Sequence, residues 1–417
     1  MKQEKFVAGI VMACLLLTLL AGTAAAEKVL KLGVMGPFTG PAAQTGKEMR
    51  VGTEMAFEEI DYKIGDYKVV IVWIDSQSDP AKATNAYAEA VERGKIQAGF
   101  LNWHSSVAVA VMDVAAKYEV PHFFGFGATK VVNEKYNSDK ERYKYWTGKG
   151  WPDQQVLCIG FVQALNDAVQ KGLWKPKNRR VAVWAEDTDA GRNEGAGYVR
   201  YFKESGWEIV HEDYFPITQT DFYPLLSKYR KGDIALMVGT STAPPSLTAL
   251  IKQKQEVQLD AVMIANGLGW SGDWYKMTGA ASDGVLDMIP KLASKEAKTW
   301  AAMVEKKYGF KPSPSACGLT YDGARFLIKI FKRAYEKHGR LDKGSILDIE
   351  LNEVDTGKLT YSKADGAIIM NMYQFTDKTM PDMVVDKDHY LFPVLQYRNG
   401  EGQVIFPPEW AATTFKE

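Results

Sequence analysis

The sequence predicts an α/β protein made of two doubly wound α/β units in tandem. Short apolar runs alternate with amphipathic helical segments from residue 28 to residue 289. This alternation is typical of parallel sheets covered by helices on both faces. The chain also has 417 residues, of which 46% are hydrophobic, and this supply is enough for two or three separate cores.

The first unit shows strand and helix patterns in strict alternation. Apolar runs of strand length are bounded by turn residues, and helical segments repeat their apolar residues every three to four positions. Pro80 stands in the first turn of one helix, where its missing N–H costs nothing. Strands are expected at 29–35, 68–74, 96–101, 122–124 and 142–146, and helices at 46–60, 80–93 and from 105 onward.

The second unit repeats the alternation and is followed by a different ending. Two long amphipathic segments come first, and short apolar runs separated by turn residues complete the chain. Strands of the unit are expected at 180–184, 207–215, 234–238, 261–265 and 285–289, and helices at 152–171, 193–205, 222–230 and 246–255. After it, helices are expected at 295–308 and 321–338, and strands at 358–361, 367–375, 391–397 and 404–406.

The N-terminus has the pattern of a secretory signal peptide. Lys2 and Lys5 precede an apolar run at 6–20, and Ala24 to Ala26 supply small residues for cleavage. We expect residues 1–26 to be removed and the mature protein to be exported. Cys14 lies in the middle of the apolar run, which favours plain cleavage over a lipid anchor.

The balance of charges argues against a nucleic-acid partner, and two cysteines remain to be explained. Lys+Arg and Asp+Glu are both 51, so no basic field points to nucleic acid. Cys158 and Cys317 remain after cleavage, and nothing local decides whether they pair.

The candidate site lies at the ends of two successive predicted strands. Because parallel strands end at one edge of a sheet, the two following loops are expected to meet where such sheets bind ligands. Backbone N–H groups at a helix start suit a carboxylate or another acceptor-rich molecule. The simpler alternative is that Ser105 only caps a helix and Gly127 only makes a turn. The candidate residues are Trp103, His104, Ser105, Ser106, Gly127, Ala128 and Thr129.

Enzyme signatures are weak. The segment from Gly40 to Lys47 resembles a phosphate loop, but five residues separate its glycines, and Glu48 stands where Ser or Thr would hold magnesium. The five histidines show no ligand spacing. We therefore expect a binding protein that is not an enzyme, with no metal and no cofactor.

Several segments together resemble one family. They are KVLKLGVMGPFTGPAAQTG, Asp79-Pro80, SSVAVAVMDVAAKYEVP, Gly127 to Thr129, Asp189-Ala190-Gly191 and the final strand before Asn399-Gly400. Their order and spacing are similar to those of the ABC-transporter solute-binding proteins of the branched-chain-amino-acid type, the leucine/isoleucine/valine-binding protein family.

The resemblance implies the type I periplasmic binding fold, a Venus-flytrap of two α/β lobes joined by a hinge of crossing strands. We expect lobe 1 to comprise 27–147 plus 287–375 and lobe 2 to comprise 148–286 plus 376–417. It also implies a small-molecule ligand in the cleft, an ABC permease as partner and a monomer. Ligand identity and a role in sensing instead of transport stay open.

In amino-acid-binding members of the family, a serine and a threonine hold the carboxylate. These positions match Ser105 or Ser106 and Thr129. A carbonyl at the Gly127 position and an acid of the second lobe hold the ammonium.

The sequence departs from this pattern on the ammonium side. Asn266 stands at the position of the acid, and Ala190, Thr240 and Thr45 replace aromatic walls. An ammonium buried without a counter-charge is costly. We therefore predict a bulky or aromatic carboxylate, stacked on Trp103 or Trp270, in preference to a simple branched-chain amino acid. An amide-bearing or neutral ligand met by Asn266 and an amino-acid ligand remain the alternatives.

Overall fold

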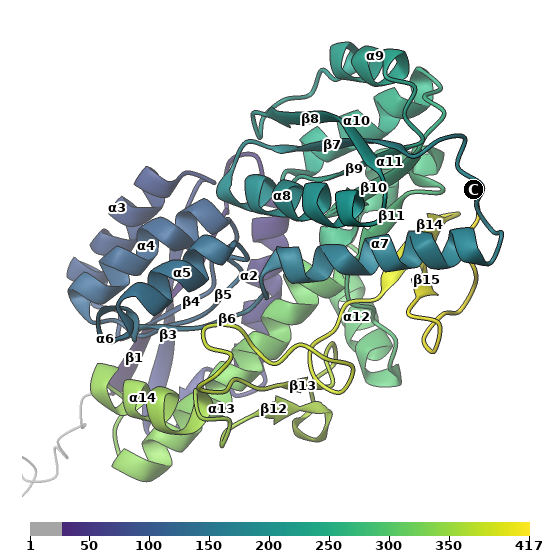
Figure 1. The fold of residues 1–417 in the computed structure, drawn as a ribbon. Coiled ribbons are helices and arrows are strands. Elements are labelled where there is room, and N and C mark those ends of the chain that lie inside the picture. Colours follow the sequence, from purple (N-terminus) through teal and green to yellow (C-terminus); the bar gives the residue numbers. More distant parts are fainter. Residues whose placement is uncertain (1–26) are drawn as a thin grey trace, which may run out of the picture.

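Two β-sheets, each flanked by helices, form the framework of the computed structural model, which describes residues 27–417 (Figure 1). The first sheet has six strands in the order β2-β3-β1-β4-β5-β6, and the second has seven in the order β15-β14-β11-β10-β9-β7-β8. Strand order that reverses about a central strand is the mark of the doubly wound arrangement. The predicted α/β class with two such units is confirmed. The predicted signal peptide lies outside the described residues.

The first sheet is built from the N-terminal third of the chain. β1 pairs in parallel with both β3 and β4, and this inner strand is buried from Leu32 to Gly36. Its strands are β1 (Lys28–Gly36), β2 (Lys63–Ile64), β3 (Tyr67–Asp75), β4 (Ala98–Phe100), β5 (His122–Gly125) and β6 (Trp146–Lys149). Its helices are α2 (Ala43–Glu58), α3 (Pro80–Glu92), α4 (Ser105–Tyr118), α5 (Lys130–Ser138) and α6 (Lys140–Tyr143).

The second sheet combines five parallel-type strands with a C-terminal hairpin. β14 joins β11 in antiparallel register, so the chain end completes a sheet begun far upstream. Its strands are β7 (Arg180–Glu186), β8 (Glu208–Phe215), β9 (Leu236–Thr240), β10 (Val262–Asn266), β11 (Leu286–Met288), β14 (Val394–Arg398) and β15 (Glu401–Phe406). Its helical segments are α7 (Gln154–Gln170), α8 (Asp189–Glu204), α9 (Tyr223–Lys231), α10 (Pro244–Glu256), η1 (Leu268–Trp270), α11 (Trp274–Thr278) and η2 (Gly279–Ser282).

The segment between β11 and β14 returns to the first sheet. Its long helix α13 packs against α2, and Phe375 stacks on Phe124 at a centroid distance of 5.8 Å. The elements of this segment are α12 (Lys295–Tyr308), η3 (Pro314–Leu319), α13 (Thr320–His338), α14 (Lys343–Ile349), η4 (Glu350–Val354), β12 (Tyr361–Ser362), η5 (Lys363–Asp365) and β13 (Met372–Tyr373).

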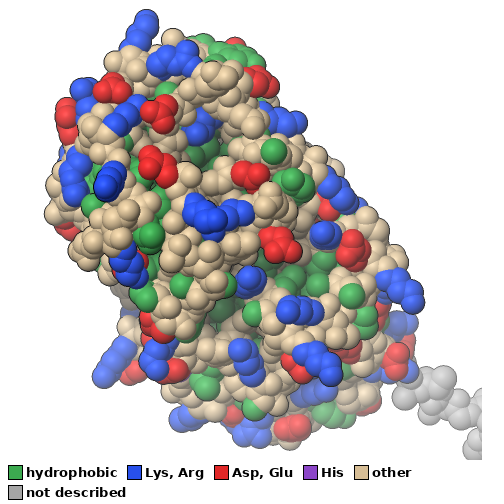
Figure 2. Space-filling view, turned by 90° about the vertical axis from the view of Figure 1, so that its right-hand side faces the viewer, with side chains coloured by type: hydrophobic (Ala, Val, Ile, Leu, Met, Phe, Trp, Pro, Cys, Tyr) green, Lys and Arg blue, Asp and Glu red, His purple; other side chains and the backbone are tan. Residues whose placement is uncertain are grey.

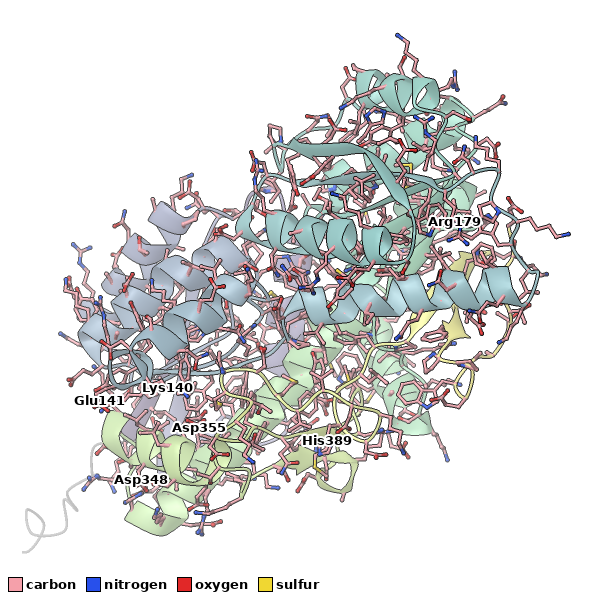
Figure 3. The ribbon with its side chains drawn as sticks, in the orientation of Figure 1. Lys140, Glu141, Arg179, Asp348, Asp355 and His389 are labelled. Atoms are coloured by element: carbon pink, nitrogen blue, oxygen red, sulfur yellow. The ribbon has the colours of Figure 1, made fainter. Side chains whose placement is uncertain are left out.

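The strand predicted at 142–146 is wrong. Asp139 caps a helical turn there, because its carboxylate accepts from the N–H of Arg142 at 3.0 Å. The turn is α6, which carries Lys140 and Glu141 (Figure 3), and β6 begins only at Trp146. The strands predicted at 358–361 and 367–375 likewise shrink to the two-residue pair β12 and β13.

The chain passes between the two sheets three times: after β6, after β11 and before β14. The first and third crossings are tied together, since the N–H of Lys149 donates to Pro381 O at 2.7 Å and Tyr390 Oη donates to Gly150 O at 2.8 Å. The predicted cuts at 147/148 and 286/287 fall inside β6 and β11. Where one lobe ends and the other begins stays a prediction.

Two remaining questions from the sequence concern cysteines and membrane segments. Cys158 and Cys317 are both buried and free. Between residues 27 and 417, no helix has the length and apolar character needed to cross a bilayer.

Candidate functional site

A small pocket lies between the two sheets, where strands of both sheets end. Aromatic and small residues line it together, and within residues 27–417 no charged side chain contributes to the lining. Charge is instead spread over the outer surface, where Figure 2 shows basic and acidic side chains mixed across one face. The lining residues are Trp103, Ser105, Phe126, Ala128, Trp151, Gln154, Ala190, Thr242 and Trp270.

Four aromatic rings form a closed circuit around this pocket, which we call the aromatic box: Trp103, Phe126, Trp151 and Trp270. Each ring meets the next nearly at right angles. The Trp103 ring lies 5.8 Å from Phe126 at 89° and 5.6 Å from Trp270 at 84°. The Trp151 ring lies 6.4 Å from Phe126 at 82° and 5.6 Å from Trp270 at 81°. Aromatic rings therefore form four successive walls of the pocket.

Five helices begin at the pocket. Ser105 and Gln154 are the first residues of α4 and α7, and Ala190 is the second residue of α8. Ala128 and Thr242 each stand two residues before a helix, α5 and α10. The starts of α5, α7 and α8 are capped by Thr129, Asp153 and Thr188, while α4 has no side-chain cap. Each helix N-terminus also carries partial positive charge. Their convergence favours a carboxylate or another acceptor-rich group.

The predicted hydroxyl cluster is divided among three tasks. Ser105 lines the pocket, and its Oγ accepts from the Thr129 N–H at 3.3 Å. Thr129 is buried behind it and caps α5, accepting from the N–H of Val131 at 3.3 Å. Ser106 Oγ accepts from the Asp189 N–H at 3.3 Å, which joins α4 of the first sheet to α8 of the second. Ser105 therefore lines the pocket, whereas Ser106 and Thr129 lie outside the lining.

Asn266 lies behind the lining, bound to an acid. Its Nδ2 donates to Glu194 Oε1 at 2.7 Å, and its backbone oxygen accepts from Thr240 Oγ1 at 3.0 Å. Glu194 also accepts from Tyr198 at 2.6 Å, and its burial raises the pKa of this carboxyl to about 7. An acid is thus present in the second sheet's layer, but it is supplied by α8 and held by Asn266.

A second buried carboxylate supports the pocket wall directly. Glu186 accepts from the N–H of Thr242 at 2.7 Å and from Thr242 Oγ1 at 2.8 Å. Ser241 and Thr188 also donate to it, at 3.2 and 2.8 Å. Burial raises the pKa of Glu186, and these hydrogen bonds oppose the rise.

The remaining predicted residues lie around the pocket without lining it. His104 is buried, neither ring nitrogen has a partner, and burial lowers its pKa to about 4. Thr45 is buried on α2 with its hydroxyl unpaired. Gly127 packs against Ala108, where a Cβ would come within 2.3 Å of the alanine methyl.

Sequence reasoning missed Trp151, Gln154 and Thr242 as parts of the pocket. Trp151 and Gln154 follow β6, the third successive strand to end at this edge. The strand was predicted to end at Trp146, whereas β6 ends at Lys149. Trp151 therefore did not stand close to a predicted strand end and was not selected.

Several buried polar atoms at the pocket lack a partner. They are Nε1 of Trp103, Trp151 and Trp270 and Oε1 of Gln154. An unpaired buried polar group costs about 1–3 kcal/mol, which a ligand that pairs with these atoms would recover. In the described part of the chain, no group of three or more His, Cys, Asp or Glu is placed to hold a metal ion.

Glu48 links the two halves of the molecule near Trp270. This buried carboxylate of α2 accepts from the Gly272 N–H at 2.9 Å and from the Ser313 N–H at 2.7 Å. Burial raises its pKa to about 7. The residue that breaks the phosphate-loop pattern therefore anchors the loop that carries one wall of the aromatic box.

Solved structures with the same fold span nearly the whole chain. A putative branched-chain amino acid ABC transporter protein from Silicibacter pomeroyi matches with a TM-score of 0.70 and 19% identity, covering 93% of this chain and 99% of that one. A solute-binding protein of an ABC transporter from R. palustris, in complex with benzoate, matches with a TM-score of 0.71 and 15% identity, covering 93% and 98%. A leucine-binding protein from Thermotoga maritima matches at 0.67 and 20%, covering 90% and 97%.

Curated relatives match over a shorter region. The Leu/Ile/Val-binding protein homolog 6 of Brucella abortus (strain 2308) is 28% identical over 215 residues, which are 51% of this chain and 50% of that protein. The chain thus spans about half the length of the relatives it matches there. The family model for periplasmic binding proteins matches residues 29–376. With the two-sheet fold and the pocket between the sheets, this match shows that the chain belongs to the periplasmic binding protein family.

Proposed function

We propose that this protein is the solute-binding component of an ABC importer, captures a small organic acid between its two lobes and delivers it to a permease. We place it in the periplasm after signal-peptide cleavage, as a monomer with no catalytic role. The ligand is a carboxylate with a bulky apolar end, such as an aromatic ring, in preference to a simple branched-chain amino acid.

One observation carries the proposal: five helix N-termini and four aromatic rings surround a single pocket. The helix starts favour a carboxylate, and the rings favour an apolar body packed against their faces. Asn266 and its partner Glu194 lie outside the lining, so an α-ammonium gains no direct acid from the pocket wall. A pocket with helix starts and aromatic rings but no acid in its lining supports a ring carboxylate over leucine.

Structures with this fold support the same class of ligand. Proteins of Rhodopseudomonas palustris strains were solved with 3,4-dihydroxybenzoic acid and with p-hydroxybenzoic acid. A Streptococcus pneumoniae protein of the same fold was solved with isoleucine. These proteins are less than 25% identical to this chain, so the choice between ring acids and amino acids is argued from the residues of this pocket.

Calorimetric titration of the purified protein tests the proposal. We expect benzoate or phenylacetate to bind more tightly than leucine and phenylalanine. Free amino acids binding at micromolar levels, with ring acids inert, would overturn the preference for ring carboxylates.

A pair of matched variants tests the location. Trp270→Phe should weaken ring-acid binding by about 0.5–1.5 kcal/mol, because part of the stacking surface and one indole N–H are lost. Trp300→Phe is the control: Trp300 is equally buried, its Nε1 is also unpaired, and it lies outside the pocket lining. Equal effects of the two variants would remove the aromatic box from the binding site.

A further inference from the structure

The aromatic box has the geometry of a cage as well as that of a stacking slot. A slot for a flat ring needs two parallel walls, whereas four successive walls at 81–89° enclose a rounded group from all sides. Three of the four walls are tryptophan, the side chain whose ring face attracts cations most strongly. Enclosure by several such faces is the arrangement that recognises methylated ammonium groups.

The electrostatic surroundings favour a cation at the box. No lysine or arginine of residues 27–417 lines the pocket, so no full positive charge opposes a cation there. Two buried carboxylates stand one layer behind the wall: Glu186, bound to Thr242, and Glu194, one helical turn after Ala190 on α8. In their ionised form, carboxylates at this depth are weakly screened by solvent, and a cation in the box favours that form.

A primary ammonium fits the lining poorly. It carries three N–H donors, each of which needs an acceptor. Among the lining residues of the described chain, the one buried acceptor without a partner is Gln154 Oε1, and the other unpaired atoms are indole N–H donors. A quaternary ammonium has no N–H to satisfy, so its methyl groups can pack on the four rings at no cost in hydrogen bonds.

We propose that the aromatic box binds quaternary ammonium groups and that the ligands of this protein include small carboxylates carrying a trimethylammonium end. The carboxylate of such a zwitterion meets the helix N-termini, and the methylated cation enters the box. This inference rests on the proposed function, because it assigns a substrate class to the same pocket.

An isosteric pair of probes isolates the effect of the charge. Glycine betaine and 3,3-dimethylbutanoate differ by the exchange of the quaternary nitrogen for carbon, so they have the same shape and the same carboxylate. In calorimetric titrations of the full-length mature protein, we expect betaine to bind at least tenfold more tightly than its carbon isostere. Glycine, with a primary ammonium, should bind more weakly than both.

The outcomes separate the inference from the proposed function. Equal or weaker binding of betaine, with the isostere or benzoate bound, overturns the cation cage and leaves the organic-acid function standing. Failure of every carboxylate to bind overturns both.

A variant pair checks that the rings cause the preference. Trp103→Phe should lower the betaine-to-isostere affinity ratio at least threefold, because a phenyl face attracts a cation less than an indole face. Trp300→Phe should leave the ratio unchanged. A ratio that is the same in wild type and Trp103→Phe would contradict the assignment.

Discussion

At the scale of single residues, the most consequential side chain behind the pocket is Glu194. Its two donors, Asn266 and Tyr198, both reach Oε1, while Oε2 is buried without a partner. Burial raises its pKa from 4.5 to about 7. Between these two values the folded protein keeps a proton that the unfolded chain has released, so the free energy of unfolding falls as pH rises through this window.

Replacing Glu194 with glutamine should remove this dependence. The glutamine oxygen can still accept from Asn266 and Tyr198, and its neutral amide replaces the protonated carboxyl. We expect the wild-type free energy of unfolding to decline from pH 5 to pH 8, with on the order of 3 kcal/mol of that decline absent in Glu194→Gln. Urea unfolding at both pH values measures it. Glu204→Gln, on the exposed end of the same helix, is the control, and an unchanged decline in Glu194→Gln would contradict the assignment.

At the scale of elements, α2 is held to two distant segments by Glu48. Removing the carboxylate leaves the N–H groups of Gly272 and Ser313 without acceptors inside the molecule. We expect Glu48→Ala to lower the free energy of unfolding by about 1–3 kcal/mol for each N–H left unpaired. Thermal and urea unfolding check this, beside Glu54→Ala on the same helix, where the side chain is partly exposed. A loss equal to that of Glu54→Ala would show that the two contacts contribute little.

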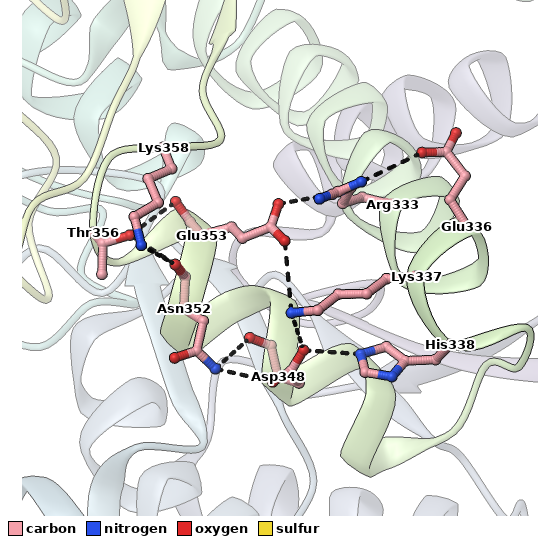
Figure 4. Close-up of polar contacts among 9 residues, drawn as sticks. All are labelled: Arg333, Glu336, Lys337, His338, Asp348, Asn352, Glu353, Thr356 and Lys358. Atoms are coloured by element: carbon pink, nitrogen blue, oxygen red, sulfur yellow. Dashed lines mark hydrogen bonds and ion pairs between the residues drawn. The ribbon is translucent and has the colours of Figure 1, made fainter.

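In contrast to the buried Glu48, the polar network between α13 and the segment that begins with α14 lies near solvent. Asp348 accepts from Lys337 at 2.7 Å and contacts His338 Nε2 at 2.8 Å, while Arg333 reaches Glu353 at 2.8 Å (Figure 4). The Lys337 and Asp348 side chains are 37% and 32% exposed. Partly exposed ion pairs contribute little and are screened by salt.

Asp348→Asn should therefore cost less than about 1 kcal/mol, and the cost should shrink further in 1 M salt. Urea unfolding at low and high salt measures both quantities. A loss of several kcal/mol that salt does not reduce would mean that the network behaves as a buried one.

Prediction from sequence succeeded where the pattern is local and long. The helix expected at 295–308 begins and ends as α12 does, and the α4 segment was identified from its apolar repeat. Prediction failed where strand pairing depends on contacts between residues distant in sequence, as in the two-residue strands β12 and β13. Glu194 and Glu186 could not be identified, because a glutamate in a sequence reads as solvent-facing unless its buried partners are known.

The pocket was predictable in part for the same reason. Trp103, Ser105 and Trp270 stand directly after apolar strands, and the rule that ligands bind at strand ends was enough to select them. Asn266 and Thr240 end strands as well, yet the Asn266 side chain donates to Glu194 and Thr240 Oγ1 donates to the backbone oxygen of Asn266. Only packing between sheets separates the residues that face the pocket from those that face the layer behind.

At the scale of the whole molecule, hydrogen bonds join segments of the two sheets beside the pocket. The hydrogen bond from the Asp189 N–H to Ser106 Oγ is one of them. In binding proteins of this kind, two lobes close around ligands by hinge motion. A bond that exists only when the lobes are together should stabilise the bound state without affecting the fold of either lobe.

Ser106→Ala should therefore raise the ligand dissociation rate about 2- to 10-fold, the equivalent of one ordinary hydrogen bond. The free energy of unfolding without ligand should stay within about 0.5 kcal/mol of wild type. Stopped-flow dissociation and urea unfolding measure the two, with Ser138→Ala on the exposed end of α5 as control. An unchanged dissociation rate would remove this contact from the closing of the pocket.

The tryptophans of the aromatic box have an optical consequence. Trp103, Trp151 and Trp270 are three of the 11 tryptophans in the chain, and the Trp270 indole contacts the other two. A solute inserted among them changes the emission wavelength and intensity of several neighbouring fluorophores at once. The unlabelled protein thus carries its own spectroscopic reporter of occupancy.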